Sequence, residues 1–164
     1  MSYFIIIRGP LGSGKSTIAR KLAHALFAEH IFLDVVLAKY GLDKIDSQIG
    51  CISLSNFLKA NEILIPELRK KLSNGKIIIL DGCFYYQEQI EQLIEQLQFP
   101  HYVFTLKIPL DECVKRDSKR SKSYGGGAAK AVYNLVTQFD YGIVIDAGRP
   151  LGEILDEMRL KLPV

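Results

Sequence analysis

Residues that build disulfide frameworks or zinc sites are scarce in this chain. The 164 residues include three cysteines, which are odd in number, widely separated and without a CxxC spacing: Cys51, Cys83 and Cys113. The three histidines form no ligand pattern either. We therefore expect reduced, partly buried thiols, as in a cytoplasmic protein, and neither disulfides nor bound zinc.

Long apolar runs are missing as well. No run approaches the roughly 20 residues that a membrane-spanning helix needs, and the N-terminus lacks the charged region and the small-residue cleavage site of a signal peptide. Glycine and proline are not in excess and no internal repeat is present, which argues against disordered and fibrous chains. The 48% of apolar residues suffices for a buried core, and the length fits one domain over residues 1–164.

A large charge of either sign is also absent, because the net charge is only +3. Such a value does not by itself suggest a nucleic-acid partner. The segment from Lys107 to Lys130 nevertheless holds seven basic residues against three acidic ones. This local surplus predicts that an anion docks there.

Short apolar runs alternate with segments of helical periodicity. Runs of Ile, Val, Leu and Phe without polar alternation are typical of a parallel sheet covered on both faces. The predicted buried strands are Phe4–Ile7, Ile31–Leu33, Ile77–Leu80, Tyr102–Leu106 and Ile143–Ile145. The predicted helices are Ser16–Ala28, Ser53–Leu72 (one or two helices, with Pro66 at a break or in a first turn), Gln87–Leu97, Asp111–Ser121, Ala128–Gln138 and Leu151–Leu160. This order predicts a doubly wound α/β fold, a three-layer sandwich around a five-stranded parallel sheet.

The connection between the first strand and the first helix has the pattern Gly-x-x-x-x-Gly-Lys-Ser. Its glycines let backbone N–H groups point inward around an anion, and the following helix directs its positive dipole end at the same point. Lys15 adds a full charge for the phosphates, and the hydroxyl of Ser16 suits Mg²⁺. A chance glycine turn is the alternative, and it needs neither the lysine nor the hydroxyls. The predicted phosphate loop comprises Gly9, Pro10, Leu11, Gly12, Ser13, Gly14, Lys15, Ser16 and Thr17.

This loop resembles the P-loop, or Walker A motif, of nucleoside-triphosphate-binding proteins. The later segments resemble the small P-loop kinases, the group that includes shikimate kinase, adenylylsulfate kinase, chloramphenicol phosphotransferase and adenylate kinase. The resemblance implies a P-loop kinase fold with a lid, and it implies ATP and Mg²⁺ as cofactors. The sequence contains no Asn-Lys-x-Asp motif that would read guanine, which fits ATP.

Two acids follow predicted strands, where open α/β sheets bind ligands. Asp81 resembles the Walker B acid, which implies that it holds Mg²⁺ through water or orients the acceptor; a plain Asp-Gly turn is the alternative. The resemblance implies that Asp34 contacts the acceptor hydroxyl as the general base. Its alternative is to cap the following helix.

The basic segment resembles the lid of these kinases, at about residues 114–130. Arg116 and Arg120 are four residues apart and share a helix face. The resemblance implies that Arg116 packs on the adenine and that Arg120 reaches the transferring phosphate. A solvated helix face with Glu112 and Asp117 as partners of the arginines is the alternative. After the last strand, Arg149 and the backbone of residues 147–150 are weaker candidates for the nucleotide site.

The acceptor-binding lobe is expected at about residues 35–72. Next to Asp81, we predict that Gly82 and one of the aromatic residues Phe84 and Tyr85 face the acceptor. No arginine lies between Arg20 and Arg69, which argues against shikimate and nucleoside monophosphates as acceptors. A less acidic hydroxyl compound held by lysine, amide and aromatic groups fits better.

The sequence thus predicts an ATP- and Mg²⁺-dependent kinase that acts on a small molecule in the cytoplasm. Two alternatives stay open: a nucleotide-dependent switch or regulatory ATPase, and a nucleoside-monophosphate or polynucleotide kinase. A nucleic-acid partner is not expected, because one lid-sized patch is small for a duplex. No membrane partner is expected, and the sequence leaves the oligomeric state open, with a monomer compatible.

Overall fold

The computed structural model of the chain describes residues 1–119 and 126–163. Its main sheet has the strand order β2-β5-β1-β6-β7, and all four neighbouring pairs are parallel. The five strands are β1 (Phe4–Arg8), β2 (Glu29–Phe32), β5 (Ile78–Gly82), β6 (His101–Lys107) and β7 (Ile143–Asp146). The predicted five-stranded parallel sheet is therefore confirmed.

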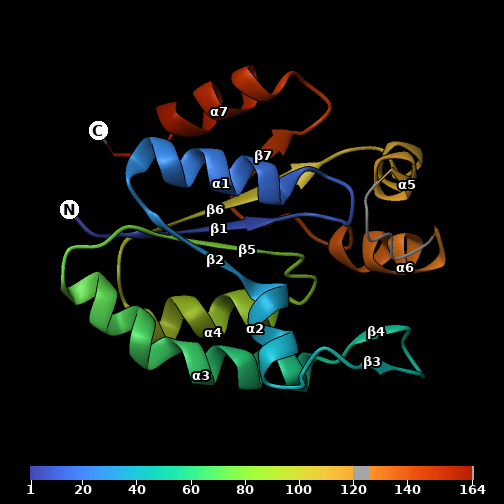
Figure 1. The fold of residues 1–164 in the computed structure, drawn as a ribbon, viewed down its shortest axis with the longest axis horizontal. Helices are drawn as coiled ribbons and strands as arrows, with labels where there is room; N and C mark the ends of the chain where they lie inside the picture. Colours follow the sequence, from blue (N-terminus) through green and yellow to red (C-terminus); the bar gives the residue numbers. More distant parts are fainter. Residues whose placement is uncertain (120–125, 164) are drawn as a thin grey trace.

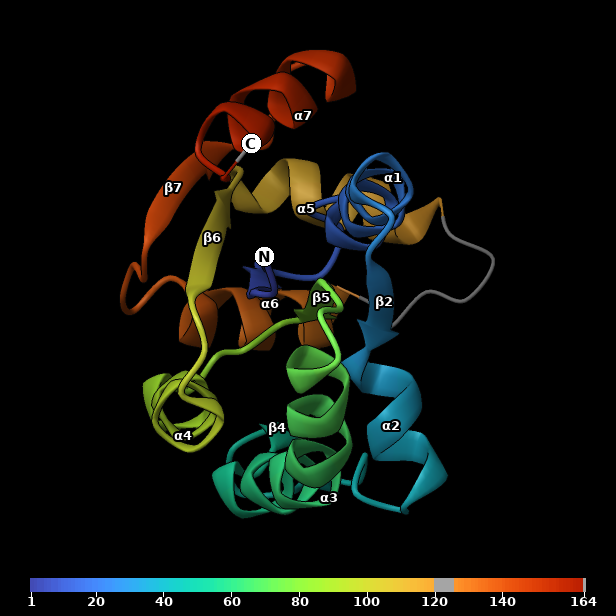
Figure 2. The same cartoon turned by 90° about the vertical axis from the view of Figure 1, so that its left-hand side faces the viewer.

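Helices cover both faces of this sheet and complete the three layers (Figures 1 and 2). They are α1 (Lys15–Leu26), α2 (Leu33–Lys39), α3 (Leu54–Ser73), α4 (Gln87–Leu97), α5 (Leu110–Ser118), α6 (Gly126–Val136) and α7 (Leu151–Leu160). The pair α1 and α7 packs on one face, and α3 and α4 pack on the other (Figure 1). In the described part of the chain, no helix is long and apolar enough to cross a membrane.

The central strand β1 explains the run of three isoleucines near the start of the sequence. Phe4 and Ile6 pack into the core beneath the face covered by α3 and α4, whereas Ile5 and Ile7 pack into the core on the α1 side. A parallel strand buried on both faces needs apolar side chains at every position. The edge strands β2 and β7 are only partly buried, and β6 is exposed at both of its ends. Of the five strands, β1 and β5 are buried along their whole length.

Three features of the segment between β2 and β5 differ from the predicted pattern. The sequence pattern does not predict the short helix α2. It also does not predict the antiparallel hairpin of β3 (Ile45–Asp46) and β4 (Cys51–Ile52), which projects from the acceptor-lobe region (Figure 1). Strands of two residues are too short to show a periodic sequence pattern, and contacts with residues distant in the chain stabilise them. The helix α3 is continuous through Pro66, so both alternatives for this proline were wrong. Pro66 and Glu62 are both exposed, and water can bond the carbonyl that the proline leaves without a donor.

The proposed acceptor lobe and lid correspond to the following elements of the structure. The segment expected as the acceptor lobe, about residues 35–72, contains most of α2, the hairpin and most of α3. The segment expected as the lid runs from the end of α5 into α6, and its residues 120–125 lie outside the described part. All three cysteines are buried and none forms a disulfide.

A buried arginine at the end of β1 joins the sheet to α6. The side chain of Arg8 is fully buried, and its Nη2 donates to the carbonyl of Val136, the last residue of α6, at 2.9 Å. Its Nη1 donates to Thr105 Oγ1 and to the carbonyl of Phe139, both at 3.1 Å. Its Nε donates to the carbonyl of Phe84 at 3.1 Å. The guanidinium therefore satisfies carbonyl groups at the C-terminal end of α6, where the helix dipole is negative.

Burying the charged Arg8 side chain removes its contacts with water, and its hydrogen bonds to carbonyl and hydroxyl groups offset this loss. Burial lowers the pKa of Arg8 to about 10, while Asp140 opposes this decrease. The guanidinium still carries its charge at neutral pH, and it also lies 4.2 Å from the ring centre of Phe139. The position of α6 relative to the sheet therefore depends on one cationic side chain.

We predict that Arg8→Lys lowers the free energy of unfolding by about 2–4 kcal/mol. A lysine retains the positive charge but lacks the three guanidinium nitrogens that donate hydrogen bonds in different directions. Urea unfolding followed by circular dichroism measures the loss. The exposed Arg20, replaced by lysine, is the matched control and should unfold at the parent's urea concentration. Equal midpoints for the two variants would contradict the role given to Arg8.

Candidate active site

The predicted phosphate loop connects β1 to α1 at the carboxyl edge of the sheet (Figure 1). Gly12 and Gly14 have φ angles of 77° and 85°, a backbone region that favours glycine. Gly14 is the N-cap residue of α1, and no side chain caps this end of the helix. The first turn of α1 contains no acidic residue. The free N–H groups and the positive dipole end of α1 are thus left for a bound anion.

Gly12 packs directly on the backbone of α5. A β-carbon at Gly12 would lie 2.3 Å from the carbonyl oxygen of Cys113, far inside contact distance. The absence of a side chain therefore lets α5 approach the loop. Because α5 also carries Arg116, this contact fixes how an arginine from the lid segment meets the phosphate loop.

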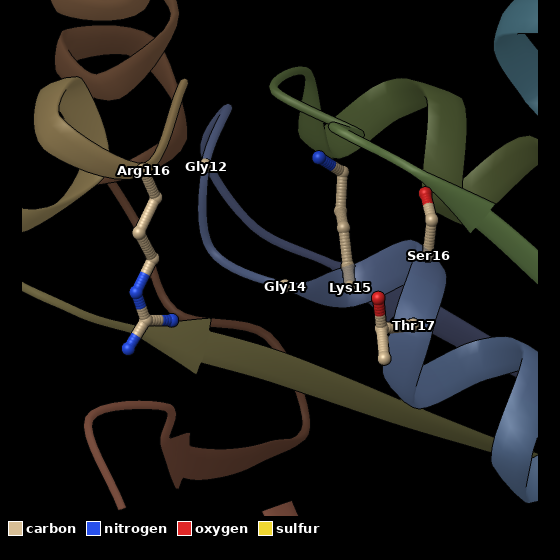
Figure 3. Close-up of a pocket in the computed structure, with 6 residues that line it drawn as sticks. All are labelled: Gly12, Gly14, Lys15, Ser16, Thr17 and Arg116. Carbon is tan, nitrogen blue, oxygen red and sulfur yellow. The ribbon is translucent and has the colours of Figure 1, made fainter. Parts of the chain in front are cut away.

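A pocket of about 250 Å³ lies between the loop and α5, lined by Gly12, Gly14, Lys15, Ser16, Thr17 and Arg116 (Figure 3). Arg116 reaches it from α5, on the other side of the loop from Lys15 (Figure 3). Its Nη1 would lie 3.8 Å from a β-carbon on Gly14, and its Nε donates to Glu112 Oε1 at 3.1 Å. Arg116 thus lies beside the phosphate loop, whereas the resemblance implies that it packs on the adenine. It also pairs with Glu112, as the alternative expected. Two cations, a helix N-terminus and a glycine cradle fit a polyphosphate.

The remaining loop residues shape this turn. The Pro10 carbonyl accepts the Ser13 N–H at 3.2 Å and the Lys15 Nζ at 3.3 Å. The buried Ser13 Oγ has no hydrogen-bond partner within residues 1–119 and 126–163, and it would lie 2.9 Å from a β-carbon on Gly9. The side chain of Leu11 is buried and points to a second cavity, described below.

Lys15 is held among acidic groups below the loop. The side chain is 6% exposed. Burial acts to lower the pKa of Lys15, but Cys83, Asp81 and Asp34 outweigh it, so the pKa is raised. Burial also raises the pKa of the Cys83 thiol to about 11, so the thiol is neutral at physiological pH. The two carboxylates are therefore the negative partners of the Lys15 ammonium.

Asp81, the residue before the last one of β5, has one carboxylate oxygen engaged and one available. Its side chain is fully buried, and Oδ2 lies 3.1 Å from His30 Nε2. The other oxygen, Oδ1, has no hydrogen-bond partner among the described residues. This oxygen belongs to a buried carboxylate close enough to Lys15, the residue before Ser16, to raise the pKa of that lysine. An unsatisfied carboxylate oxygen suits a hydrated Mg²⁺, which takes few protein ligands. The donor set therefore fits the magnesium that the resemblance implies.

A second cavity, of about 410 Å³, opens next to the phosphate loop, and we call it the acceptor cavity. It is bounded by the loop, α2, the β3–β4 hairpin, the exit of β5 and α6. Its lining residues are Leu11, Phe32, Asp34, Val35, Leu37, Ala38, Asp43, Ile45, Gly50, Cys51, Ile52, Phe57, Cys83, Tyr85, Ala128 and Val132. Asp34 is the second residue of α2, and the N-cap position belongs to Phe32. The structure thus places Asp34 in this cavity and not at the helix cap.

The aromatic residues after Asp81 divide between cavity and core. Tyr85 lines the acceptor cavity, its hydroxyl accepts the Ile52 N–H at 2.8 Å, and burial raises its pKa. Phe84 is fully buried with a φ of 46°, and its ring does not line the cavity. Gly82 is buried at the end of β5, where a β-carbon would meet Leu33 and Phe84. Tyr86 donates to the Ile52 carbonyl at 3.1 Å, so two tyrosines hold β4.

The structure does not bring every predicted residue to the site. Arg149 pairs with Glu157 of α7, and its Nε donates to the Asp146 carbonyl at 3.3 Å. Arg120 lies outside the described residues. The sequence patterns did not point to His30 or Cys83. The one signal that could have pointed to His30 is its place directly before the apolar strand residues Ile31 and Phe32. Among the described residues, no group of three or more His, Cys, Asp or Glu is arranged to hold a metal.

We predict that Gly12→Ala weakens nucleotide binding by at least about tenfold, because the methyl group displaces α5 and Arg116 from the loop. Titration with a fluorescent ATP analogue measures this effect. Gly152 in α7 has nothing within 4 Å of an added β-carbon and an ordinary φ, so Gly152→Ala is the control. Parent-like affinity in Gly12→Ala would show that the packing on Cys113 is dispensable.

We predict that His30→Ala lowers the free energy of unfolding by about 1–3 kcal/mol, because the buried Asp81 loses its hydrogen-bond donor. His30→Gln retains a donor and should recover part of the loss. Urea unfolding at neutral pH gives both values, and the exposed His24 replaced by alanine controls for histidine removal. The assignment fails if His30→Ala and His24→Ala are equally stable.

Comparison with known proteins finds kinases among those similar to this chain. Curated relatives include the shikimate kinases of Actinobacillus pleuropneumoniae serotype 5b (strain L20) and serotype 3 (strain JL03), each 29% identical over 116 residues, which is 71% of this chain. The match spans 66% of the length of those relatives.

Solved structures with a similar fold include a sugar kinase from Janibacter sp. HTCC2649, with a TM-score of 0.82 at 17% identity over 98% of this chain and 94% of that one. A gluconokinase from Sinorhizobium meliloti 1021 has a TM-score of 0.66 at 15% identity, covering 95% and 91%. A shikimate kinase from Aquifex aeolicus vf5 has a TM-score of 0.63 at 20% identity, covering 96% and 94%. Residues 4–137 match the family model described as AAA domain. The resemblance to the small P-loop kinases is thus confirmed, and the chain belongs to the AAA domain family.

Proposed function

We propose that this protein is an ATP- and Mg²⁺-dependent kinase that transfers the γ-phosphoryl group to a hydroxyl of a small molecule. One observation carries the proposal: the phosphate pocket and the acceptor cavity meet at the P-loop. Gly12 lines the pocket, the neighbouring Leu11 lines the cavity, and Lys15 lies among acids of both β5 and α2. This arrangement suits in-line transfer between two bound molecules.

Each residue of the pocket has a role in holding the nucleotide. The loop N–H groups and the α1 N-terminus would bind the phosphates, Lys15 would neutralise the transferring group, and Arg116 would approach it from α5. The hydroxyl of Ser16 and the free oxygen of Asp81 would hold the hydrated magnesium, and Thr17 would reach a further phosphate oxygen. Bound Mg²⁺ supplies charge neutralisation for the phosphates. Arg120, Arg149 and the backbone of residues 147–150 remain proposed nucleotide contacts.

Asp34 is the proposed general base. It lies in the acceptor cavity, close enough to Lys15 to affect its pKa. As the acceptor oxygen forms its bond to the γ-phosphorus, the bond to the β–γ bridging oxygen breaks and ADP leaves. The acceptor proton passes to Asp34. Lys15 and Arg116 compensate the negative charge on the phosphoryl oxygens.

The size of the acceptor cavity and the names of the relatives support a small-molecule acceptor. A volume of about 410 Å³ lies within the usual range for sites that bind small molecules. The similar proteins are named shikimate kinase, gluconokinase and sugar kinase. A polynucleotide kinase or a pure nucleotide switch gains no specific support from the described residues. The three buried, unpaired thiols suit a cytoplasmic location, which we include in the proposal.

We predict that Asp34→Asn reduces phosphate transfer by about 100-fold or more while nucleotide binding stays near the parent value. Transfer of labelled γ-phosphate from Mg-ATP into a fractionated metabolite extract gives the rate, and a fluorescent ATP analogue gives the affinity. Lys15→Ala should abolish transfer, and the exposed Lys21→Ala should not change it.

Two results would count against the proposal. Full transfer by Lys15→Ala would remove the P-loop from the reaction. ATP binding by the parent without a labelled product from any extract would favour a switch.

A further inference from the structure

The acceptor cavity has few polar groups for a site that would bind a sugar or an acid. Most of its lining is aliphatic or aromatic, and the hydroxyl of Tyr85 is already engaged with Ile52. Its two thiols, of Cys51 and Cys83, are weak hydrogen-bond partners. A polyol would lose hydrogen bonds to water here and regain few.

Among the described residues, the charged side chains that line this cavity are both acids, Asp34 and Asp43. No described lysine or arginine lines it. A carboxylate or phosphate on the acceptor would therefore meet like charges at both places. A cationic group would meet the opposite charge.

Exposed aliphatic side chains border the mouth of the cavity. Val35 and Ile45 line it and are 60% and 61% exposed. Large exposed aliphatic groups at the edge of a cavity indicate a surface that an apolar ligand covers. Val35 follows Asp34 in α2, and Ile45 is the second residue after Asp43 in the chain, so the apolar rim accompanies both acids.

The two acids lie toward opposite ends of α2. Asp34 is in the first turn, whereas Asp43 follows the end of the helix, where the Leu42 N–H closes the turn on the Leu37 carbonyl at 2.8 Å. The seven residues of α2 place its ends about 10 Å apart at a rise of about 1.5 Å per residue. A ligand that contacts both acids therefore reaches from the first turn of α2 to its C-terminal end.

The environments of the two carboxylates differ. Asp34 is close enough to Lys15 to raise the pKa of that lysine. The negative charge of Asp34 is therefore balanced by the Lys15 ammonium at the phosphate end of the cavity. Asp43 is exposed and has no ion pair or side-chain hydrogen bond with the described residues. Of the nearby lysines, Lys39 places its Nζ 5.4 Å from the ring centre of Tyr40, and Lys44 does not line the cavity.

We propose that the acceptor is an elongated, largely apolar amino alcohol, whose hydroxyl lies at Asp34 and whose ammonium group is recognised by Asp43. This inference rests on the proposed kinase function and adds the chemical class of the acceptor. Asp43 is then the specificity-determining residue for charge. Val35, Ile45 and Phe57 contact the hydrocarbon between the two polar ends.

Three probes of equal length test the proposal: aminooctanol, octanediol and hydroxyoctanoate, each with its two groups at opposite ends of the chain. Calorimetric titration of the full chain with a non-hydrolysable ATP analogue and Mg²⁺ measures their affinities. We expect aminooctanol to bind about tenfold more tightly than octanediol, and hydroxyoctanoate to bind most weakly. Asp43→Asn should abolish the difference between aminooctanol and octanediol, and Asp43→Lys should favour hydroxyoctanoate.

Asp46→Asn is the matched control, because Asp46 is an exposed acid three residues after Asp43, in β3, that does not line the cavity. Its Oδ1 accepts the Gln48 N–H at 2.8 Å, a bond that asparagine retains. This variant should show the parent's order of affinities. Equal affinities for the three probes, a preference for hydroxyoctanoate, or no measurable binding of any probe would overturn the proposal.

A transfer assay with the same probes separates this inference from the proposed function. Binding of aminooctanol without its phosphorylation would support the acceptor class and count against a kinase. Phosphorylation of hydroxyoctanoate in preference to aminooctanol would support a kinase and overturn the acceptor class.

Discussion

The buried ammonium of Lys15 is the interaction on which the rest of the site depends. Its Nζ donates to the Pro10 carbonyl at 3.3 Å, and the charges of Asp81 in β5 and Asp34 in α2 favour the charged form against the effect of burial. A buried cation persists only where acids or hydrogen-bond acceptors compensate the loss of water. The same ammonium therefore links the phosphate pocket to the acceptor cavity, because it interacts with acids of both β5 and α2.

The surrounding fold keeps that cluster rigid through close backbone contacts. The absence of a side chain at Gly12 allows α5 to rest on the P-loop, so Arg116 and Lys15 converge from different elements. On the other side of the loop, Arg8 fastens the end of α6 to the sheet, and α6 in turn contributes Ala128 and Val132 to the acceptor cavity. A site assembled this way positions both reactants on packed secondary structure, which is what transfer between two bound molecules requires.

How well the sequence predicted each part of the structure depended on how far apart in the chain its interacting residues lie. The P-loop and the five-stranded sheet followed from local patterns, since glycine spacing and unbroken apolar runs each have few structural solutions. The hairpin of β3 and β4 did not, because tyrosine hydroxyls far along the chain hold Ile52. Phe84 and Tyr85 are adjacent and chemically alike, yet the positive φ of Phe84 directs its ring into the core while Tyr85 lines the cavity.

The sequence by itself determined the phosphate-binding chemistry, because a loop, a lysine and a helix N-terminus are contiguous in the chain and need no distant partner. It also determined the parallel sheet, through the apolar content of the strands. Only the tertiary structure decided what surrounds the acceptor. Asp34, Asp43, Cys83 and Val132 come from separate elements, and their meeting in one cavity depends on packing between elements that no local pattern encodes. The pairing of His30 with Asp81 has the same origin, because it requires β2 to lie beside β5.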